Sequence, residues 1–270
     1  MEAISFVILG LTYMDALPPV EKILAMLACV FFVTLGSYGF NSVTDFQEDS
    51  VNKPLSQINT GRKTWRDILN FSLACKLLAV ASAYFISWAV LAAVSIILLG
   101  SFFYSSTPLG GGRLKDMLII KNITIALLWS VLLLLPMLAW GASIPLAFLA
   151  VVFFVFTHDF ISSVLSDLKD VEGDRQAGIK TFPSVYGERN TLALLASANI
   201  LGLAAILAGW MFLGLKPYLF LLPLACASRA YMFSLIYSKR QSAAEVYRKL
   251  DRPTETALGP LALVGRLLVH

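Results

Sequence analysis

The chain has 270 residues, of which 58% are hydrophobic and only 14% are charged, and its mean hydropathy is +0.76. Soluble globular proteins carry about 25% charged residues, so this composition excludes an ordinary soluble enzyme or nucleic-acid-binding domain. It predicts an all-α, polytopic membrane protein. The three cysteines lie inside apolar stretches, where we expect buried thiols rather than disulfides or a metal cluster.

Nine apolar segments follow one another along the chain, and the first and last are short. A helix of about 14 residues spans about 21 Å, less than the ~30 Å hydrocarbon core, so these two are expected to be tilted or partial spans. No polar stretch is long enough to build its own core, and residues 1–270 are expected to form a single domain. The segments cover residues 3–14, 20–42, 68–86, 88–106, 118–139, 145–166, 191–214, 217–238 and 255–269.

Basic residues gather in every second connection between these segments. The remaining connections hold only Lys22 and Lys216. Because cytoplasmic loops are enriched in Lys and Arg, the alternation predicts a multi-pass protein of the cell membrane with a cytoplasmic N-terminus. The basic connections contain Lys53, Arg62, Lys63, Arg66, Arg113, Lys115, Lys121, Lys169, Arg175, Lys180, Arg189, Lys239, Arg240, Arg248, Lys249 and Arg252.

Two acidic motifs end the second and sixth segments, both on the predicted cytoplasmic side. The first reads "NSVTDFQEDS" and spaces its polar residues by four; the second reads "SDLKDVEGDR" and spaces its acids by three and four. Each set therefore faces one side of a helix, where like charges repel unless a cation balances them. Mg²⁺ prefers such oxygen ligands and is often shared with substrate phosphates. The predicted metal ligands are Asn41, Asp45, Asp49, Asp167, Asp170 and Asp174.

Basic side chains in the same loops would bind phosphate oxygens or simply neutralise the acids, and the sequence leaves both roles open. A metal and cations around a diphosphate would stabilise the charge that develops when an allylic diphosphate ionises. The membrane would supply an apolar site for the prenyl tail. A simpler interpretation is that the acids are solvated loop charges.

The two motifs resemble those of the UbiA superfamily of intramembrane prenyltransferases. The first motif, over residues 41–62, matches through Asn41, Asp45, Asp49, Asn52, Pro54, Gly61 and Arg62. The second, over residues 167–183, matches through Asp167, Asp170, Glu172, Gly173, Asp174, Arg175, Gly178, Thr181 and Pro183. Between them, "FYSSTPLGGGRLK" is similar to the family's Tyr-Ser and Leu-Lys loop through Tyr104, Ser105, Leu114 and Lys115. The chain departs from the family pattern at Ser42 and at Ser56–Gln57, where the family has Asp and Arg-Pro.

The resemblance implies about nine helices around a central cavity with polar cap loops on the cytoplasmic side. It also implies Mg²⁺, a prenyl diphosphate donor and an aromatic or lipid acceptor, as in the synthesis of isoprenoid quinones or archaeal ether lipids. The residues expected to be catalytic are Asp45, Asp49, Asp170, Asp174 and Lys115. Those expected to bind the diphosphate are Asn41, Arg62, Tyr104, Lys115, Arg175 and Lys180.

His158 and Asp159 interrupt the sixth apolar segment. An acid inside a membrane span is a candidate for function, and Asp159 is expected to orient the acceptor or take its proton. Alternatively, Asp159 pairs with His158 or Lys76 inside the bundle.

Three functions are compatible with these patterns. The leading hypothesis is a Mg²⁺-dependent prenyltransferase, and a membrane terpene cyclase would use the same metal site without an acceptor. A cation transporter is a third hypothesis, but transporters place ion sites near the midplane of the membrane, whereas these acids lie at the ends of spans.

Overall fold

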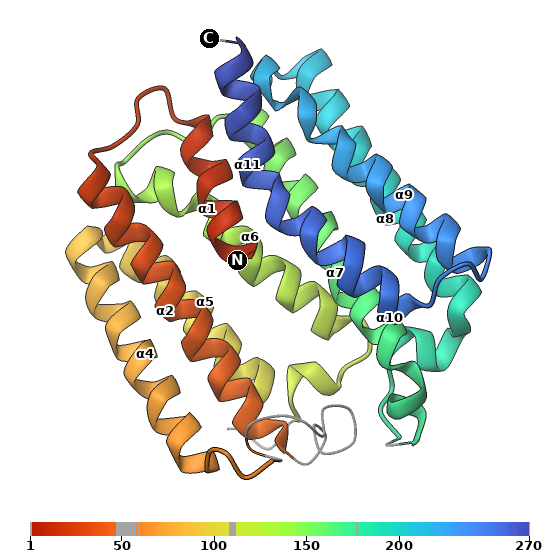
Figure 1. Ribbon diagram of the computed structural model, residues 1–270. Helices are drawn as coiled ribbons and strands as arrows, with labels where there is room; N and C mark the ends of the chain where they lie inside the picture. The colour runs from red at the N-terminus through yellow and green to blue at the C-terminus, as the bar shows by residue number, and fades with distance from the viewer. Residues whose placement is uncertain (1, 47–57, 59, 108–111, 177, 270) are drawn as a thin grey trace.

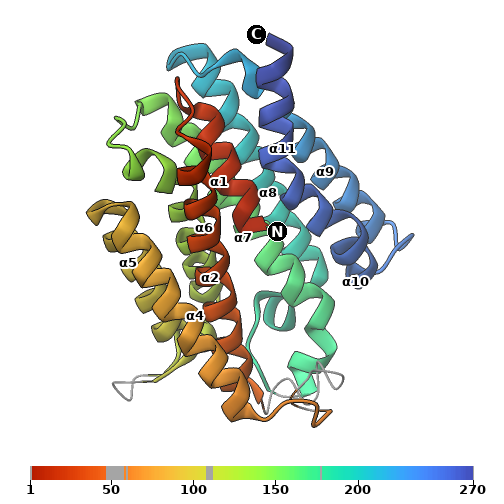
Figure 2. The ribbon, with the colours of Figure 1, turned by 60° about the vertical axis from the view of Figure 1, so that its left-hand side comes forward.

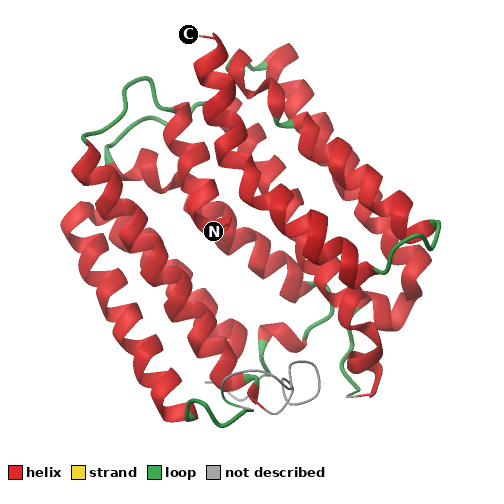
Figure 3. Ribbon diagram, in the orientation of Figure 1, coloured by secondary structure: helices red, strands yellow, loops and turns green. Residues whose placement is uncertain are grey.

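The computed structural model describes residues 2–46, 58, 60–107, 112–176 and 178–269. Within these ranges the regular structure is entirely helical (Figure 3). The α-helices are α1 Glu2–Tyr13, α2 Val20–Thr44, α4 Trp65–Ile86, α5 Trp88–Ser105, α6 Ile120–Ala139, α7 Leu146–Gln176, α8 Phe182–Phe212, α9 Pro223–Tyr237, α10 Ala243–Val246 and α11 Arg252–Val269. Shorter turns are η1 Leu114–Asp116 and η2 Pro217–Leu221, which are 3₁₀ helices, and η3 Tyr247–Asp251, which is a π-helix.

Each of the nine apolar segments predicted from sequence contains a helix. In the described part, seven helical stretches are long and apolar enough to cross a membrane. They are α2, α4, α5, α6, α7, α8 and the continuous stretch Pro217–Tyr237. The 12-residue α1 is apolar but short, and α11 begins with charged residues. The chain is therefore a multi-pass membrane protein, while the count of nine complete spans is not confirmed.

The helices form one bundle with two sides (Figure 1). Helices α2, α4 and α5 pack on one side, and α7, α8 and α9 pack on the other. Helices α1, α6 and α11 lie between them, and Figure 2 shows α1 and α11 in front of α7 in a second view. The ends of α2, α5 and α7 all lie at the lower edge of Figure 1, so both acidic motifs belong to the same end of the bundle.

Local sequence signals explain where several helices begin. The Thr64 hydroxyl accepts from the Asp67 backbone N–H, and the Asp67 carboxylate accepts from the Thr64 N–H, which caps the first turn of α4 on both sides. Ser87 caps α5 in the same way with its side chain. Ser87 is the single residue between α4 and α5, so its cap starts α5 immediately after α4 ends.

Small residues bring α1 and α11 into close contact. A Cβ atom on Gly259 would lie 2.2 Å from the Ser5 carbonyl oxygen, so only glycine fits there. The Ser5 hydroxyl accepts from the Gly259 N–H at 2.8 Å and donates to the Glu255 carbonyl at 3.2 Å. Small residues and hydroxyl groups are the usual means of helix association in membranes, where hydrophobic burial offers no gain. The short first helix is thereby fixed to the last.

Helix α7 extends further than its apolar segment suggests. The hydrophobic pattern ends near residue 166, but the helix continues to Gln176. The second acidic motif is consequently a helical extension beyond the apolar part of α7, and Asp167, Asp170 and Asp174 project from one helix as their spacing predicts. The first motif differs: α2 ends at Thr44 and Asp45 is its C-terminal cap. Asp49 lies outside the described residues.

Candidate active site

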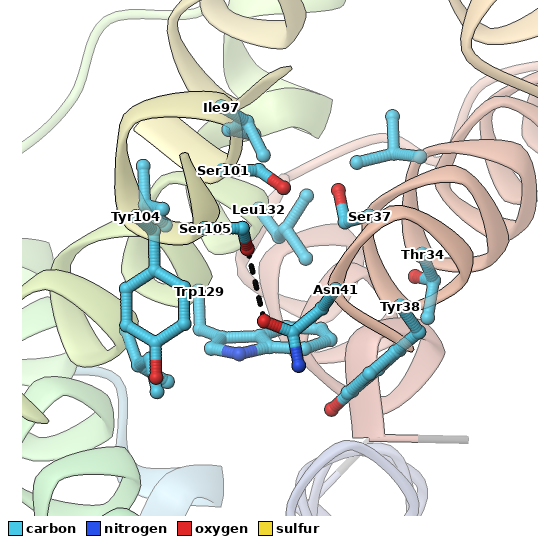
Figure 4. Close-up of a pocket in the computed structure, with 13 residues that line it drawn as sticks. Thr34, Ser37, Tyr38, Asn41, Ile97, Ser101, Tyr104, Ser105, Trp129 and Leu132 are labelled. Atoms are coloured by element: carbon cyan, nitrogen blue, oxygen red, sulfur yellow. Dashed lines mark hydrogen bonds between the residues drawn. The ribbon is translucent and has the colours of Figure 1, made fainter. Parts of the chain in front are cut away.

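An apolar cavity of about 160 Å³ opens between α2, α5 and α6. Most of its wall is aliphatic or aromatic, and Trp129 lies across it in Figure 4. The Trp129 ring packs 6.1 Å from the Tyr38 ring and 6.4 Å from the Phe6 ring, centroid to centroid. Polar groups enter the wall from α2 and α5, namely those of Thr34, Ser37, Asn41, Ser101 and Ser105. The cavity is thus suited to a hydrocarbon chain whose polar end lies toward Asn41.

Asn41 connects the cavity to the first acidic motif. Its Oδ1 accepts a 2.9 Å hydrogen bond from the Ser105 hydroxyl of α5, drawn in Figure 4, and its Nδ2 donates to Asp45 Oδ2 at 2.8 Å. The other carboxylate oxygen of Asp45 accepts from the Thr44 hydroxyl at 3.2 Å and pairs with the ammonium group of Lys115. Asp45 and Lys115 are both buried. An acid, an amide and an ammonium group therefore meet at the polar end of the cavity.

The turn that carries Lys115 is held by its neighbours. The Arg113 guanidinium binds both carboxylate oxygens of Asp116, at 2.8 and 2.9 Å. Partial burial acts to raise the pKa of Asp116, but the hydrogen bonds and charge of Arg113 outweigh it and hold that pKa below its usual range. A fork-shaped contact of this kind fixes the short η1 helix, and with it the direction of the Lys115 side chain.

The second acidic motif has its own lysine and amide. Asp167 of α7 pairs with Lys121 at 2.6 Å and accepts from Asn122 Nδ2 at 3.1 Å, both from the start of α6. Asn122 also donates to the Ser163 hydroxyl at 2.9 Å. The arrangement around Asp167 thus repeats that around Asp45: one carboxylate, one amide and one lysine from a neighbouring element.

The remaining acids of the second motif lie further along α7. Asp170 pairs with its neighbour Lys169, and the buried Asp174 is hydrogen-bonded by the Thr181 side chain, which caps α8. Thr181 belongs to the second motif, and its place in the structure explains why that motif continues past the acids. It ties the end of α7 to the start of α8.

The predicted diphosphate ligands occupy different positions. Tyr104 lines the cavity, and Lys115 pairs with Asp45, the hydrogen-bond partner of Asn41. Arg62, Arg175 and Lys180 are exposed. No role was predicted from the sequence for Lys121, Ser105, Ser163 or Trp129, although Lys121, Ser105 and Ser163 contribute to the polar groups just described. The match of "YSS" to the family pattern was the available signal for Ser105.

The donor set suits a hard cation such as Mg²⁺. The groups at this end of the bundle are carboxylate and amide oxygens, which Mg²⁺ prefers, together with lysines that suit phosphate. Among the described residues, however, no three His, Cys, Asp or Glu side chains are close enough to hold a metal ion together. Lys115 and Lys121 instead neutralise Asp45 and Asp167. The metal role of Asn41, Asp45, Asp49, Asp167, Asp170 and Asp174 remains a prediction.

Comparison with known proteins identifies the class to which this site belongs. Residues 3–250 match the UbiA prenyltransferase family, and the chain belongs to that family. The predicted superfamily is therefore confirmed, and the prenyltransferase hypothesis prevails over the cation transporter.

Individual relatives differ in what they make. The chain is 24% identical over 197 residues to a digeranylgeranylglyceryl phosphate synthase of Pyrococcus furiosus, covering 73% of this chain and 67% of the relative. It is 29% identical over 196 residues to the somaliensene A/B synthase of Streptomyces somaliensis, covering 70% of this chain and 62% of that relative. The chain thus spans about two thirds of the length of these relatives.

The fold is also that of solved family members. A UbiA homologue from Archaeoglobus fulgidus, solved with GPP and Mg²⁺, superposes with a TM-score of 0.79 at 16% identity, covering 98% of this chain and 94% of the other. The all-helical architecture predicted from sequence is confirmed.

Proposed function

We propose that this protein transfers a prenyl group from a prenyl diphosphate to a lipid acceptor inside the membrane, with Mg²⁺ as its cofactor. The observation that carries the proposal is the cavity between α2, α5 and α6, whose wall is mostly apolar and includes Asn41. Asn41 is hydrogen-bonded to Asp45, which pairs with Lys115. A prenyl diphosphate has the same division into a long apolar tail and a compact anion. The Archaeoglobus fulgidus homologue, solved with GPP and Mg²⁺, supports the choice of ligand.

In this proposal, Asp45 and Asp167 hold the metal with Asn41, Asp49, Asp170 and Asp174. Mg²⁺, when bound, would neutralise the diphosphate and stabilise it as a leaving group. Lys115 and Lys121 would then leave the carboxylates and bind the phosphate oxygens. Further ligands of the diphosphate would be Arg62, Tyr104, Arg175 and Lys180. The apolar walls, with Trp129 and Tyr38 among them, hold the prenyl chain and exclude water while the allylic carbon is electron-deficient.

We infer a lipid acceptor from the relatives. The Pyrococcus furiosus relative is a digeranylgeranylglyceryl phosphate synthase, whose product name contains two prenyl chains on a glyceryl phosphate. An acceptor of this kind already lies in the membrane. An aromatic acceptor of quinone synthesis has no such support among the relatives described above. We also propose that the acidic end of the bundle and the N-terminus face the cytoplasm, because the basic connections lie on that side.

A terpene cyclase is the second candidate, and the similarity to the Streptomyces somaliensis somaliensene A/B synthase favours it. It would ionise the same diphosphate and close the resulting cation on itself, without an acceptor. The cavity and the acids at its mouth serve both reactions equally.

One experiment separates these functions. Purified protein in lipid nanodiscs would receive prenyl diphosphates of 10 to 20 carbons, with Mg²⁺ or EDTA, with and without geranylgeranylglyceryl phosphate. Diphosphate and prenylated product are measured separately. Mg²⁺-dependent diphosphate release with an equal amount of alkylated acceptor supports the transferase, and release with a cyclic hydrocarbon in the absence of acceptor supports the cyclase. A folded protein that releases no diphosphate from any donor would contradict both.

A further inference from the structure

Two serine hydroxyls enter the cavity from different helices. Ser37 of α2 and Ser101 of α5 both line it, and Figure 4 shows their oxygen atoms reaching into the space between the two helices from opposite sides. The Oγ atom of Ser37 is buried and has no hydrogen-bond partner among the described residues. Ser101 is 8% exposed, and the described part of the chain gives its hydroxyl no partner either. We call Ser37 and Ser101 the serine pair.

Several other hydroxyls of the long apolar helices are satisfied by their own backbone. A serine or threonine inside a helix often donates to the carbonyl four residues earlier. Thr34, which lines the same cavity, donates to the Val30 carbonyl at 2.8 Å, and Ser130 of α6 donates to the Ala126 carbonyl at 2.7 Å. Ser37 does not make this bond. Because buried polar groups are almost always hydrogen-bonded, its hydroxyl indicates a polar atom of a ligand at this depth of the cavity.

The serine pair lies one helical turn deeper than the Asn41 amide. Asn41 of α2 and Ser105 of α5 are joined by a hydrogen bond of 2.9 Å. Ser37 precedes Asn41 by four residues, Ser101 precedes Ser105 by four, and both helices end at the acidic end of the bundle. Four residues advance a helix by about 6 Å. The two hydroxyls therefore lie at a common level, about 6 Å deeper in the bundle than the Asn41–Ser105 bond.

This depth relates the serine pair to the reacting carbon of the donor. In the proposed function the diphosphate lies near Asn41, and the allylic carbon is bonded to its bridging oxygen. The prenyl chain beyond that oxygen consists of carbon and hydrogen alone, so the donor offers no polar atom to the serine pair. The acceptor does offer one, because its hydroxyl oxygen must come within about 3–3.5 Å of the allylic carbon in order to react.

We propose that Ser37 and Ser101 bind the hydroxyl group of the acceptor lipid and position its oxygen against the allylic carbon. This inference rests on the proposed transferase function and specifies where the acceptor binds. A serine hydroxyl both donates and accepts a hydrogen bond. One serine accepts from the O–H of the acceptor and the other donates to its oxygen, which leaves that oxygen one lone pair directed at the carbon. The serines orient the acceptor and form no covalent bond themselves.

Asp159 and His158, which the sequence suggested for the acceptor side, are not among the residues that line this cavity. The carboxyl group of Asp159 is hydrogen-bonded to that of Glu255, and it does not pair with His158 or Lys76, the alternatives suggested by the sequence. Glu255 in turn pairs with Arg229 of α9. An acceptor hydroxyl in this cavity therefore binds groups other than Asp159 and His158.

The test compares binding of the acceptor with and without its hydroxyl group. The full-length protein in nanodiscs receives Mg²⁺, an unreactive prenyl thiodiphosphate, and either geranylgeranylglyceryl phosphate or its deoxy analogue, in which hydrogen replaces the free hydroxyl. The unmodified protein should bind the hydroxyl compound about 10-fold more tightly, the usual effect of one neutral hydrogen bond. Ser37→Ala and Ser101→Ala should each bring this ratio toward one. Ser130→Ala removes a hydroxyl that is bonded within its own helix and should leave the ratio unchanged.

A second pair of variants separates the hydroxyl group from the shape of the side chain. Ser37→Thr keeps the hydroxyl, and Ser37→Val replaces it by a methyl group of similar size. The threonine variant should retain the preference for the hydroxyl compound, and the valine variant should have an acceptor KM about 10-fold higher at an unchanged donor KM.

Tyr38 is the nearest competitor, since it also lines the cavity. Equal preferences in the threonine and valine variants, or a preference lost in Tyr38→Phe alone, would overturn the proposal. A protein that prenylates the acceptor but binds the two compounds equally refutes the serine pair and leaves the transferase function intact. If the unmodified protein neither binds the acceptor nor releases diphosphate from a reactive donor, the transferase function itself has failed.

Discussion

Two regions of the bundle beside α7 use the same residue types in opposite ways. At the acidic end of the bundle, which we call the mouth, Asp167 pairs with a lysine and remains partly accessible, as Lys121 and Asp167 are each 13% exposed at their side chains. In the interior, Arg229 and its ion-pair partners Asp251 and Glu255 are fully buried. Together with Ser162 they link α7, α9, η3 and α11. A lysine is a flexible point charge that can leave its partner, whereas a buried arginine cannot reach solvent or another partner. The mouth can exchange its cations for a ligand, and the interior cluster cannot.

The largest expected effect comes from removing the metal. If the mouth exchanges its lysines for Mg²⁺, diphosphate release should stop in EDTA and return when Mg²⁺ is restored. Thermal unfolding should change little, because Lys115 and Lys121 can neutralise Asp45 and Asp167 again. Activity and unfolding temperature measured on the same samples check both statements. Activity that persists through chelation would show that the mouth does not use a metal.

The next largest effect is expected from removing one positive charge at the mouth. Lys115→Ala should lower kcat/KM by about 100-fold or more, the usual effect of removing one group that stabilises a developing charge, with the fold intact. Lys239→Ala is the matched control, because Lys239 pairs with Glu188 on the exposed surface. Steady-state kinetics of diphosphate release measures both. Equal kinetics for the two variants would remove Lys115 from the site.

In the interior the expected effect is on stability. Arg229→Leu leaves Asp251 and Glu255 enclosed without their cation, which typically destabilises a protein by about 3–5 kcal/mol. Arg240→Leu, on an exposed arginine that follows the same helix, should have little effect. Unfolding in detergent, followed by circular dichroism, gives the comparison. Replacing Arg229, Asp251 and Glu255 together by apolar residues should recover part of the loss, since no uncompensated charge then remains.

Whether the sequence predicts each part of this contrast depends on how far apart in the sequence the interacting residues lie. The mouth was predictable, because its acids recur at helical spacing and match family motifs, and a short motif needs only its neighbours to be recognised. The helical spans were predictable from hydropathy for the same reason. The pairing of Asp159 with Glu255 was not, since these residues are distant in sequence and only the packing of α11 against α1 and α7 brings them together. Asp251 and Glu255 are four residues apart, which predicts a shared face but not its partner Arg229.

A smaller stability effect tests how the interior cluster is positioned. Glu255 and Gly259 lie one turn apart on α11, and both contact Ser5 of α1. Gly259→Ala would place a Cβ 2.2 Å from a backbone oxygen and force the two helices apart, at a cost of about 1–3 kcal/mol. Gly100→Ala is the matched control in α5, where the nearest atom is the end of the Leu128 side chain, which can turn away. The difference between their unfolding free energies measures the close contact. If the two variants unfold alike, the α1–α11 contact does not set the position of Glu255.

The smallest effect concerns the cavity wall, where neither set of charges takes part. Val33, Ile97 and Leu132 line the cavity, and Val33 lies two turns from Asn41 along α2. Leu132→Ala should enlarge the cavity and favour longer prenyl diphosphates, while Val33→Phe should favour shorter ones. Removing or adding a few carbon atoms in an apolar pocket changes discrimination by about 10-fold to 200-fold at most, and less where the wall can relax. The measurement is the ratio of kcat/KM for donors of 20 and 10 carbons, a ratio in which any general loss of stability cancels. Opposite shifts in the two variants would show that the hydrocarbon tail occupies this cavity, with its diphosphate toward the lysines of the mouth. Shifts in the same direction would place the tail elsewhere in the bundle, and the contrast between an exchangeable mouth and a fixed interior would then no longer describe how the donor binds.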